Sequence, residues 1–267
     1  MVLNTTDLAT AEPRGVWEAC RNGEWDRPTP GVCQENVQAN LVVLPLSDAF
    51  DFLRFCQRNP KPCPLIEVTD AGDPEPKLTA AGADLRTDLP RYRVYRRDEE
   101  VEERTEIRDL WRDDFVAFLL GCSYSFEYAL LAAGIPLRHI EAGENVAMYR
   151  TNIRCISAGK FAGPMVVSMR PIPARLVSHA VEVTARLPQV HGAPVHVGAP
   201  EALGITDLKR PDWDGMTEVR PDEVPVFWAC GVTPQAVALE AKPERMITHS
   251  PGHMFVTELT NKELTNR

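Results

Sequence analysis

The segment from Asp113 to Glu141 constrains the fold most, because it combines a fully apolar run, a turn and a helix pattern in one continuous stretch. Phe115 to Leu120 contains no polar residue, which is typical of a strand covered on both faces, as in a parallel sheet. After Gly121, apolar residues recur at helical spacing from Phe126 to Ala133, and Gly134 to Pro136 ends the pattern. The segment therefore predicts a buried strand that turns directly into a helix.

Cys122 stands at the turn between this strand and this helix. Open α/β sheets bind ligands where the carboxyl end of a strand meets the amino end of a helix. That helix end carries partial positive charge, which stabilises a thiolate or a bound carboxylate. We therefore expect a reactive Cys122 with a lowered pKa, and the alternative is a small buried hydrophobic residue. Ser123 or Ser125 is expected to cap the helix.

A second segment near the end of the chain repeats this order of features. Val226 to Ala229 is apolar, Cys230-Gly231 stands at the turn, and Thr233-Pro234 opens a second helix pattern. The strand that follows ends in His249. The repeat predicts two related units in one sheet, which would place their two cysteines near a common cleft.

The first half of the chain contains further strand and helix patterns. Val37 to Leu44 and Leu65 to Val68 are strand patterns, and the amphipathic pattern from Ala49 to Arg58 lies between them. This order predicts a right-handed crossover in a parallel sheet. Tyr92 to Arg97 and Val101 to Arg104 predict a hairpin at a solvated edge. The fold expected from these patterns is α/β, with a mainly parallel sheet and flanking helices.

The charge balance limits the partners of the chain. With 29 basic and 38 acidic residues the net charge is −9, which argues against nucleic acid and an anionic membrane surface as partners. No apolar run reaches the length of a membrane span, and the first residues do not resemble a signal peptide, so we expect a cytoplasmic protein. The seven cysteines suggest neither a disulfide framework nor a zinc motif.

Polar residues in unusual positions are the further candidates for ligand binding. Asn40 interrupts an apolar strand, so it must find a partner, either within the protein or in a ligand. Asn145 to Asn152 has the composition of a binding loop, in which Arg150, Thr151 and Asn152 could together hold a carboxylate. The alternative for Arg150 is an ion pair with one of the many acidic residues.

Arg170 follows the strand pattern from Pro164 to Met169 and is a second candidate for holding a carboxylate. His191 and His196 flank a Gly-Ala-Pro sequence. Because they are five residues apart, they lie on opposite faces of an extended segment and do not form a metal pair by themselves.

Several short motifs carry a resemblance to a known family. In order along the chain, from about Arg14 to Leu259, they are QANLVVLP, FLRFCQRNPKPCPL, GCSYSFE, MYRTN, GPMVVSMRP, VHGAPVHVG, VPVFWACGVTPQ and ITHSPGHM. Together they resemble the hydro-lyase family that is grouped with D-glutamate cyclase. The resemblance implies an α/β main domain interrupted by a smaller α+β domain, and an activity in which D-glutamate loses water to give 5-oxo-D-proline. With the repeated units placed in one sheet, we expect the main domain to comprise residues 1–152 and 222–267, and the inserted domain residues 153–221.

The implied cyclisation needs a neutral amine, a γ-carboxyl group made electrophilic and the release of water. Arg150 and Arg170 would hold carboxylates, Ser123 and the first amides of the following helix would polarise the reacting carbonyl, and the other catalytic candidates would move protons. The expected catalytic residues are Cys122, Ser123, Glu127, Cys230 and His249; the expected substrate-binding residues are Asn40, Ser125, Arg150, Thr151, Asn152, Arg170, His191, His196 and His253. No cofactor is certain, and a divalent metal on His249, His253 or an acid is conceivable although no spacing identifies it.

Two other functions remain open from the sequence. Two thiols facing each other across an α-carbon are the arrangement of cofactor-independent amino-acid racemases, although Gly231 to Thr233 replaces the Asn-Thr usual in their cysteine motif. The second alternative is a non-catalytic module that binds a carboxylate. The expected partner in each case is a small acidic molecule, and a homo-oligomer is expected.

Overall fold

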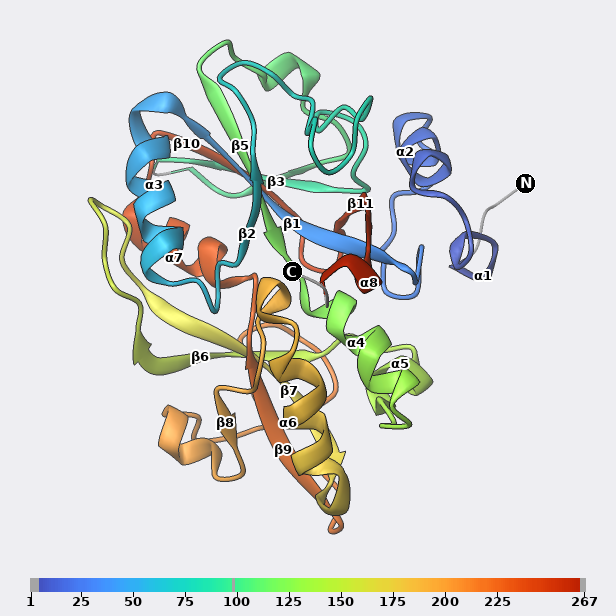
Figure 1. The fold of residues 1–267 in the computed structure, drawn as a ribbon. Helices are drawn as coiled ribbons and strands as arrows, with labels where there is room; N and C mark the ends of the chain where they lie inside the picture. The colour runs from blue at the N-terminus through green and yellow to red at the C-terminus, as the bar shows by residue number, and fades with distance from the viewer. Residues whose placement is uncertain (1–4, 98, 265–267) are drawn as a thin grey trace.

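The computed structural model describes residues 5–97 and 99–264, which form two β-sheets with helices packed around them (Figure 1). The strands of the seven-stranded sheet are β1 (Asn36–Pro45), β2 (Leu65–Val68), β3 (Tyr92–Arg96), β4 (Glu102–Arg104), β5 (Phe115–Gly121), β10 (Arg245–His249) and β11 (Phe255–Thr260). Their order is β2-β5-β1-β10-β3-β4. Strands β10 and β11 pair with the same edge of β1, each with a different half of it. The four-stranded sheet has the order β6-β7-β9-β8, from β6 (Ala147–Arg154), β7 (Pro164–Pro173), β8 (His196–Val197) and β9 (Glu223–Ala229).

The prediction of a mainly parallel sheet is wrong, because every pairing between the described strands of both sheets is antiparallel. The apolar run of β5 reflects burial on both faces and says nothing about strand direction. Val116, Phe118 and Leu120 face one core cluster, while the alternate residues Phe115, Ala117 and Leu119 face another. An antiparallel sheet covered on both faces therefore produces the same unbroken apolar pattern.

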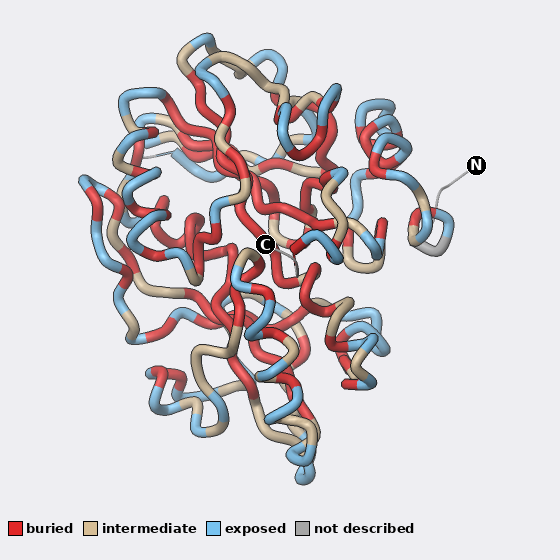
Figure 2. Tube along the Cα trace, viewed as in Figure 1, coloured by how far each residue is buried: buried red, intermediate tan, exposed pale blue. Residues whose placement is uncertain are grey.

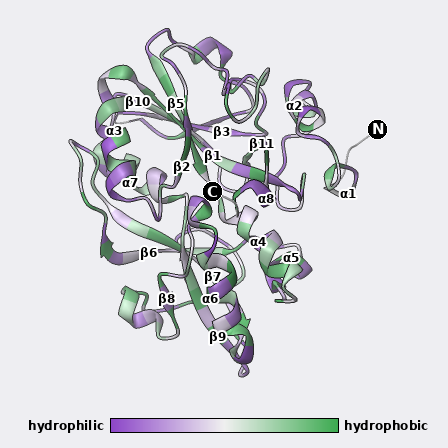
Figure 3. Ribbon diagram, viewed as in Figure 1, coloured by the Kyte–Doolittle hydropathy of each residue, from purple (hydrophilic) through white to green (hydrophobic). Residues whose placement is uncertain are grey.

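Helices and short 3₁₀ turns cover these sheets. The α-helices are α1 (Thr5–Leu8), α2 (Pro13–Arg21), α3 (Leu46–Arg58), α4 (Ser123–Ala132), α5 (Arg138–Ala142), α6 (Val177–Ala185), α7 (Thr233–Ala241) and α8 (Asn261–Leu264), and the 3₁₀ turns are η1 (Arg108–Leu110), η2 (Ala174–Leu176), η3 (Pro188–Val190) and η4 (Pro200–Leu203). Buried residues follow the strands, and exposed residues gather on loops and outer helix faces (Figure 2). Helix α3 carries both hydrophobic and hydrophilic residues (Figure 3); its buried side consists of Ala49, Phe52, Phe55 and Cys56, whereas Phe50 is exposed. Within the described part of the chain, no helix is both long and apolar enough to cross a membrane.

The structure confirms one further prediction about the strands and contradicts another. The hairpin prediction is confirmed by the pairing of β3 with β4 at the edge of the larger sheet. The stretch predicted as a binding loop is largely strand β6, in which buried and exposed side chains alternate only in part. The prediction that Phe115 to Leu120 and Val226 to Ala229 share one sheet is also wrong, because β5 and β9 belong to different sheets. The argument from two related units therefore fails, and the domain boundaries themselves stay a prediction.

Two glycines allow the sheets to approach each other closely. A Cβ atom on Gly121, at the end of β5, would lie 1.9 Å from the backbone oxygen of Gln189 in η3. A Cβ atom on Gly231, after β9, would lie 2.1 Å from Nδ2 of Asn40 in β1. The turns that carry Cys122 and Cys230 thus meet at the junction of the two sheets, although they do not come from one sheet.

Candidate functional site

The turn between β5 and α4 places the first polar side chains at this junction. Cys122 is the N-cap residue of α4, and no side chain caps the helix, so the prediction of a capping serine is wrong. Ser125 instead accepts a hydrogen bond from the backbone N–H of Gln38 at 3.1 Å, which ties α4 to β1. The Ser123 hydroxyl accepts a hydrogen bond from Nη2 of Arg170 at 3.1 Å. The serines therefore connect the helix to both sheets.

A buried ionic cluster lies between α4 and β7. Nε of Arg170 donates to Oε1 of Glu127 at 2.9 Å, and Nη2 of Arg170 also contacts this oxygen. Nη1 of Arg170 donates to the Ser168 hydroxyl at 2.9 Å. Nε2 of His139 lies 3.1 Å from the same Oε1. Arg170, expected to hold a substrate carboxylate, thus holds a carboxylate of the protein itself.

The cluster keeps Glu127 ionised. Burial raises the pKa of Glu127, but the charge of Arg170 and the hydrogen bonds from His139 and Arg170 outweigh burial and lower the pKa to about 2. The guanidinium carbon of Arg170 also lies 4.9 Å from the ring centre of Phe126 and 5.5 Å from that of Trp228. The guanidinium of Arg170 is therefore enclosed, and Glu127 carries a negative charge throughout the physiological pH range.

The two cysteines of the turns are close enough for their charges to interact, but neither is activated. Burial raises the pKa of the Cys122 thiol to about 12, with a smaller opposing effect from a backbone hydrogen bond. Burial likewise raises the pKa of Cys230 to about 11, and its sulfur lies 3.6 Å from that of Met148. The prediction of a lowered pKa at Cys122 is wrong, because desolvation by both sheets exceeds the favourable effect of the helix end.

The side chains of Asn40 and His249 contact backbone atoms in and beside strand β1. Nδ2 of Asn40 donates to the backbone oxygen of Gly121 at 2.8 Å. Nδ1 of His249 lies 3.1 Å from the backbone nitrogen of Leu41, at the place where β1 passes from one partner strand to the next. Burial lowers the pKa of His249 to about 4, so its imidazole is neutral at pH 7. His253 lies close enough to lower this pKa slightly further, and its own Nδ1 is 2.9 Å from the oxygen of Pro251.

The remaining substrate-binding candidates lie elsewhere. Arg150 is exposed, lies over the ring of Trp213 and has its Nε 4.0 Å from Asp212. The hydroxyl of Thr151 donates to the oxygen of Met165 at 2.8 Å, and the Nδ2 of Asn152 donates to Ala202 at 3.3 Å. These contacts place the three residues on strand β6, within the smaller sheet and its adjoining segments.

The two remaining histidines differ in burial. Nε2 of His196 contacts the oxygen of Ala199 at 2.9 Å near the surface. His191 is buried, and its Nδ1 lies 2.8 Å from the oxygen of Lys61. Its Nε2 has no hydrogen-bond partner among the residues that the structure describes. Burial lowers the pKa of His191 to about 4, and the charge of Arg170 lowers it further. Of these two, only His191 is therefore near the ionic cluster.

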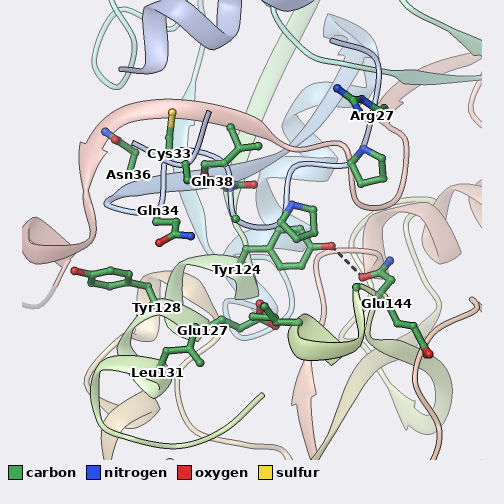
Figure 4. A pocket seen from close by; sticks show the side chains of 18 of the residues that line it. Arg27, Cys33, Gln34, Asn36, Gln38, Tyr124, Glu127, Tyr128, Leu131 and Glu144 are labelled. Atoms are coloured by element: carbon green, nitrogen blue, oxygen red, sulfur yellow. Dashed lines mark hydrogen bonds between the residues drawn. The ribbon is translucent and has the colours of Figure 1, made fainter. Parts of the chain in front are cut away.

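A cavity of about 670 Å³ opens beside the cluster (Figure 4). One wall is the loop and strand start from Trp25 to Gln38, and the other is formed by α4 and by the segment that ends at Asn145. Glu127 and Tyr124 belong to this second wall, and the hydroxyl of Tyr124 donates to Oδ1 of Asn145 at 3.0 Å. Figure 4 shows both side chains on the same side of the cavity.

Sequence reasoning did not identify Tyr124, His139 or Arg27 as site residues, and it named Asn145 only as the start of a stretch with the composition of a binding loop. Tyr124 lines the cavity, and its pKa is raised first by burial and then by the charges of Cys122 and Glu127. Arg27 is the basic residue among those that line the cavity. Only the helical spacing of Tyr124, Glu127 and Tyr128 on one face of α4 could have indicated a shared wall.

A metal site finds no support in the side-chain arrangement. Among residues 5–97 and 99–264, no three His, Cys, Asp or Glu side chains are grouped so that they could hold a metal ion. A divalent metal on His249, His253 or an acid stays a prediction.

A family model matches the part of the chain that holds the ionic cluster and the second wall of the cavity. The model described as D-glutamate cyclase matches residues 116–258, which include Glu127, His139, Arg170 and both cysteines of the turns. The chain belongs to the D-glutamate cyclase family. This confirms the family predicted from the sequence motifs.

Close relatives extend the similarity over the full length. A protein of Stutzerimonas stutzeri is 59% identical over 98% of this chain and 99% of its own length, and one of Geobacillus kaustophilus is 61% identical over 97% and 98%. Both carry the name "putative hydro-lyase". Among solved structures, a nitrogen repressor-like protein of Methanococcus jannaschii covers 79% of this chain and 80% of its own, with a TM-score of 0.39 and 14% identity, which is too distant to support an argument.

Proposed function

We propose that this chain is a hydro-lyase that cyclises an amino dicarboxylate, with D-glutamate converted to 5-oxo-D-proline as the reaction to test first. The observation that carries the proposal is the place of the cavity: its second wall is built by the family-matched segment, and the ionised Glu127 and the protonated Tyr124 both line it. The names of the close relatives support a reaction of the hydro-lyase type.

The reaction joins the α-amine nitrogen to the γ-carboxyl carbon and breaks one carbon–oxygen bond of that carboxyl group. The ammonium group loses two protons, and the departing oxygen leaves with both as water, so no external acid or base is consumed. The phenol of Tyr124 stays protonated because burial raises its pKa. Its single O–H, which donates to Oδ1 of Asn145 in this structure, would turn from Asn145 to donate a hydrogen bond to the departing oxygen. Arg27, on the facing wall, would hold the α-carboxylate.

Product identification tests this proposal. Purified protein is incubated with D-glutamate and with L-glutamate, and mass spectrometry should detect loss of one water from at least one of them. Tyr124→Phe should lower kcat by about 10²-fold to 10⁴-fold, the usual contribution of a positioned proton donor. Absence of a lactam from both enantiomers and from other amino dicarboxylates would refute the assignment.

Racemisation is the second candidate, and one observation favours it: the turns that carry Cys122 and Cys230 meet at Asn40, which donates to Gly121 and lies against Gly231. Incubation of D-glutamate in deuterated water separates the two reactions. A racemase gives L-glutamate with deuterium on the α-carbon, whereas cyclisation gives a lactam without it. A carboxylate-binding module without catalysis would give ligand-dependent thermal stabilisation and no product.

A further inference from the structure

The two carboxylate oxygens of Glu127 have different surroundings. Oε1 receives both Arg170 contacts and lies next to Nε2 of His139. No residue in the described part of the chain donates a hydrogen bond to Oε2. An ionised carboxylate has about four acceptor positions, so half of this group is saturated by the protein and half is available. Glu127 lines the cavity, and we infer that Oε2 is the oxygen that a ligand there meets, because Oε1 is occupied by Arg170 and His139.

The carboxylate is also held in one orientation. Arg170 has no exposed surface, and its remaining donors are fixed by Ser123 and Ser168. Rotation of the Glu127 carboxylate would break the contacts of Oε1 and leave the guanidinium of Arg170 buried without its counter-ion, which is strongly unfavourable. The direction in which Oε2 accepts hydrogen bonds is therefore set before any ligand arrives.

A fixed and nearly desolvated carboxylate oxygen selects the chemistry of its ligand. Charge-assisted hydrogen bonds from a cationic N–H are the strongest partners for such an oxygen, and a ligand carboxylate at the same place would be repelled. Arg27 lies across the cavity from Glu127 in Figure 4. The two walls thus offer opposite charges, as a zwitterionic amino acid requires.

We propose that Oε2 of Glu127 binds the protonated primary amine of the substrate, so that the cavity selects carboxylic acids that carry a free ammonium group. This inference rests on the proposed function and adds the group by which the substrate is recognised. It also has a consequence for turnover. The lactam product has no ammonium group, so cyclisation removes this contact and favours product release.

Binding measurements on the wild-type protein test the inference without requiring turnover. Isothermal titration calorimetry measures affinity in two series of ligands. The first compares D-aspartate, whose lactam would be a strained four-membered ring, with succinate and N-acetyl-D-aspartate. The second compares D-glutamate with glutarate, N-acetyl-D-glutamate and 5-oxo-D-proline. In at least one series the amine-bearing acid should bind about tenfold to a hundredfold more tightly than its analogues, the range expected for a charge-assisted hydrogen bond. Equal affinities within a factor of two, or no binding of either amino acid, would overturn the inference. Failure of the proposed cyclisation would appear separately, as amine-selective binding without a lactam.

Two variants test whether Glu127 is the residue that selects amine-bearing ligands. Glu127→Gln should reduce the ratio of affinities between amine-bearing and amine-free ligands to near one. Glu144→Gln removes the same charge from an exposed residue lining the same cavity, and should preserve the ratio. A ratio of affinities does not depend on the fraction of folded protein. If Glu127→Gln does not fold, the double variant Glu127→Gln/Arg170→Gln removes both buried charges and should show the same loss; preserved selectivity in either Glu127 variant would contradict the proposal.

Discussion

Nε of Arg170 lies 2.9 Å from Oε1 of Glu127, and this pair joins helix α4, which continues from the larger sheet, to strand β7 of the smaller one. Both side chains are enclosed, with 0% and 5% of their surfaces exposed. A pair in this position holds the junction of the sheets and orients the carboxylate beside the cavity at the same time. Its loss should therefore affect stability and ligand binding together.

Replacement of Arg170 tests the structural part of this relationship. Arg170→Met leaves Glu127 as a buried charge without its partner, and the free energy of unfolding should fall by about 3–5 kcal/mol. Arg93→Met is the control, because Arg93 pairs with Glu103 at the surface, with 31% and 41% of the side chains exposed, and should cost at most about 1 kcal/mol. Urea unfolding at pH 7 measures both. Equal losses of unfolding free energy in the two variants would show that the buried pair stabilises the protein no more than the surface pair does.

The contact between Gly231 and Asn40 gives a second prediction. Gly231→Ala would place a methyl group 2.1–2.3 Å from the buried side-chain amide of Asn40, so the variant should lose about 1–3 kcal/mol of stability by overpacking. Gly15→Ala is the matched control, because nothing lies within 4 Å of its added Cβ in helix α2. That variant should gain up to about 1 kcal/mol from helix propensity. A stable Gly231→Ala protein would show that the two turns are not packed as described.

The sequence predicted elements well where burial alone determines the pattern. Strands β1 and β5 and helix α3 follow from runs that are apolar throughout or on one side. Strand direction could not be predicted, because an apolar run does not encode the partner beside it. Strand β6 was missed for a related reason: Arg150 and Asn152 are exposed at the sheet edge and obscure the alternation.

The candidate site could be predicted only in part, because it too depends on which segments lie beside one another. The position of Cys122 at the start of α4 was predicted correctly, but its pKa depends first on burial by segments that the fold brings close, and less on Cys230. The cavity joins Arg27 to Glu127, which are one hundred residues apart in the chain. No local pattern contains this proximity, so the residues that line the cavity could be identified only from the structure.

Two buried histidines predict the response to acid. Burial lowers the pKa of His191 and of His249 from 6.5 to about 4, so the unfolded chain binds more protons than the folded one between these values. Their contribution to stability is present above pH 6.5 and is lost as the pH falls toward 4, by up to roughly 3 kcal/mol for each residue. Urea unfolding at pH 7.0, 5.5 and 4.5 should show this decline.

His191→Asn supplies the control for the acid response. Asn removes the titrating group and tolerates the left-handed backbone of this position, where φ is 82°. The variant should show a smaller change of stability between pH 7.0 and 4.5 than the wild type, whatever its stability at pH 7.0. A slope equal to that of the wild type would mean that His191 is not buried in its neutral form.

Reactivity toward alkylating agents tests the thiol of Cys122 directly. Its pKa of about 12 leaves almost no thiolate at pH 8, and only 6% of the residue is exposed. We expect iodoacetamide to modify Cys122 in the folded protein at least 100-fold more slowly than in 8 M urea, because both the thiolate fraction and access are restored by unfolding. Peptide mapping by mass spectrometry follows each of the seven cysteines, all of which are buried, and Cys122→Ser identifies the peptide of interest. Rapid modification of native Cys122 at pH 8, slowed by D-glutamate, would instead show an exposed thiolate in contact with the ligand. Cys122 would then be a candidate catalytic residue again.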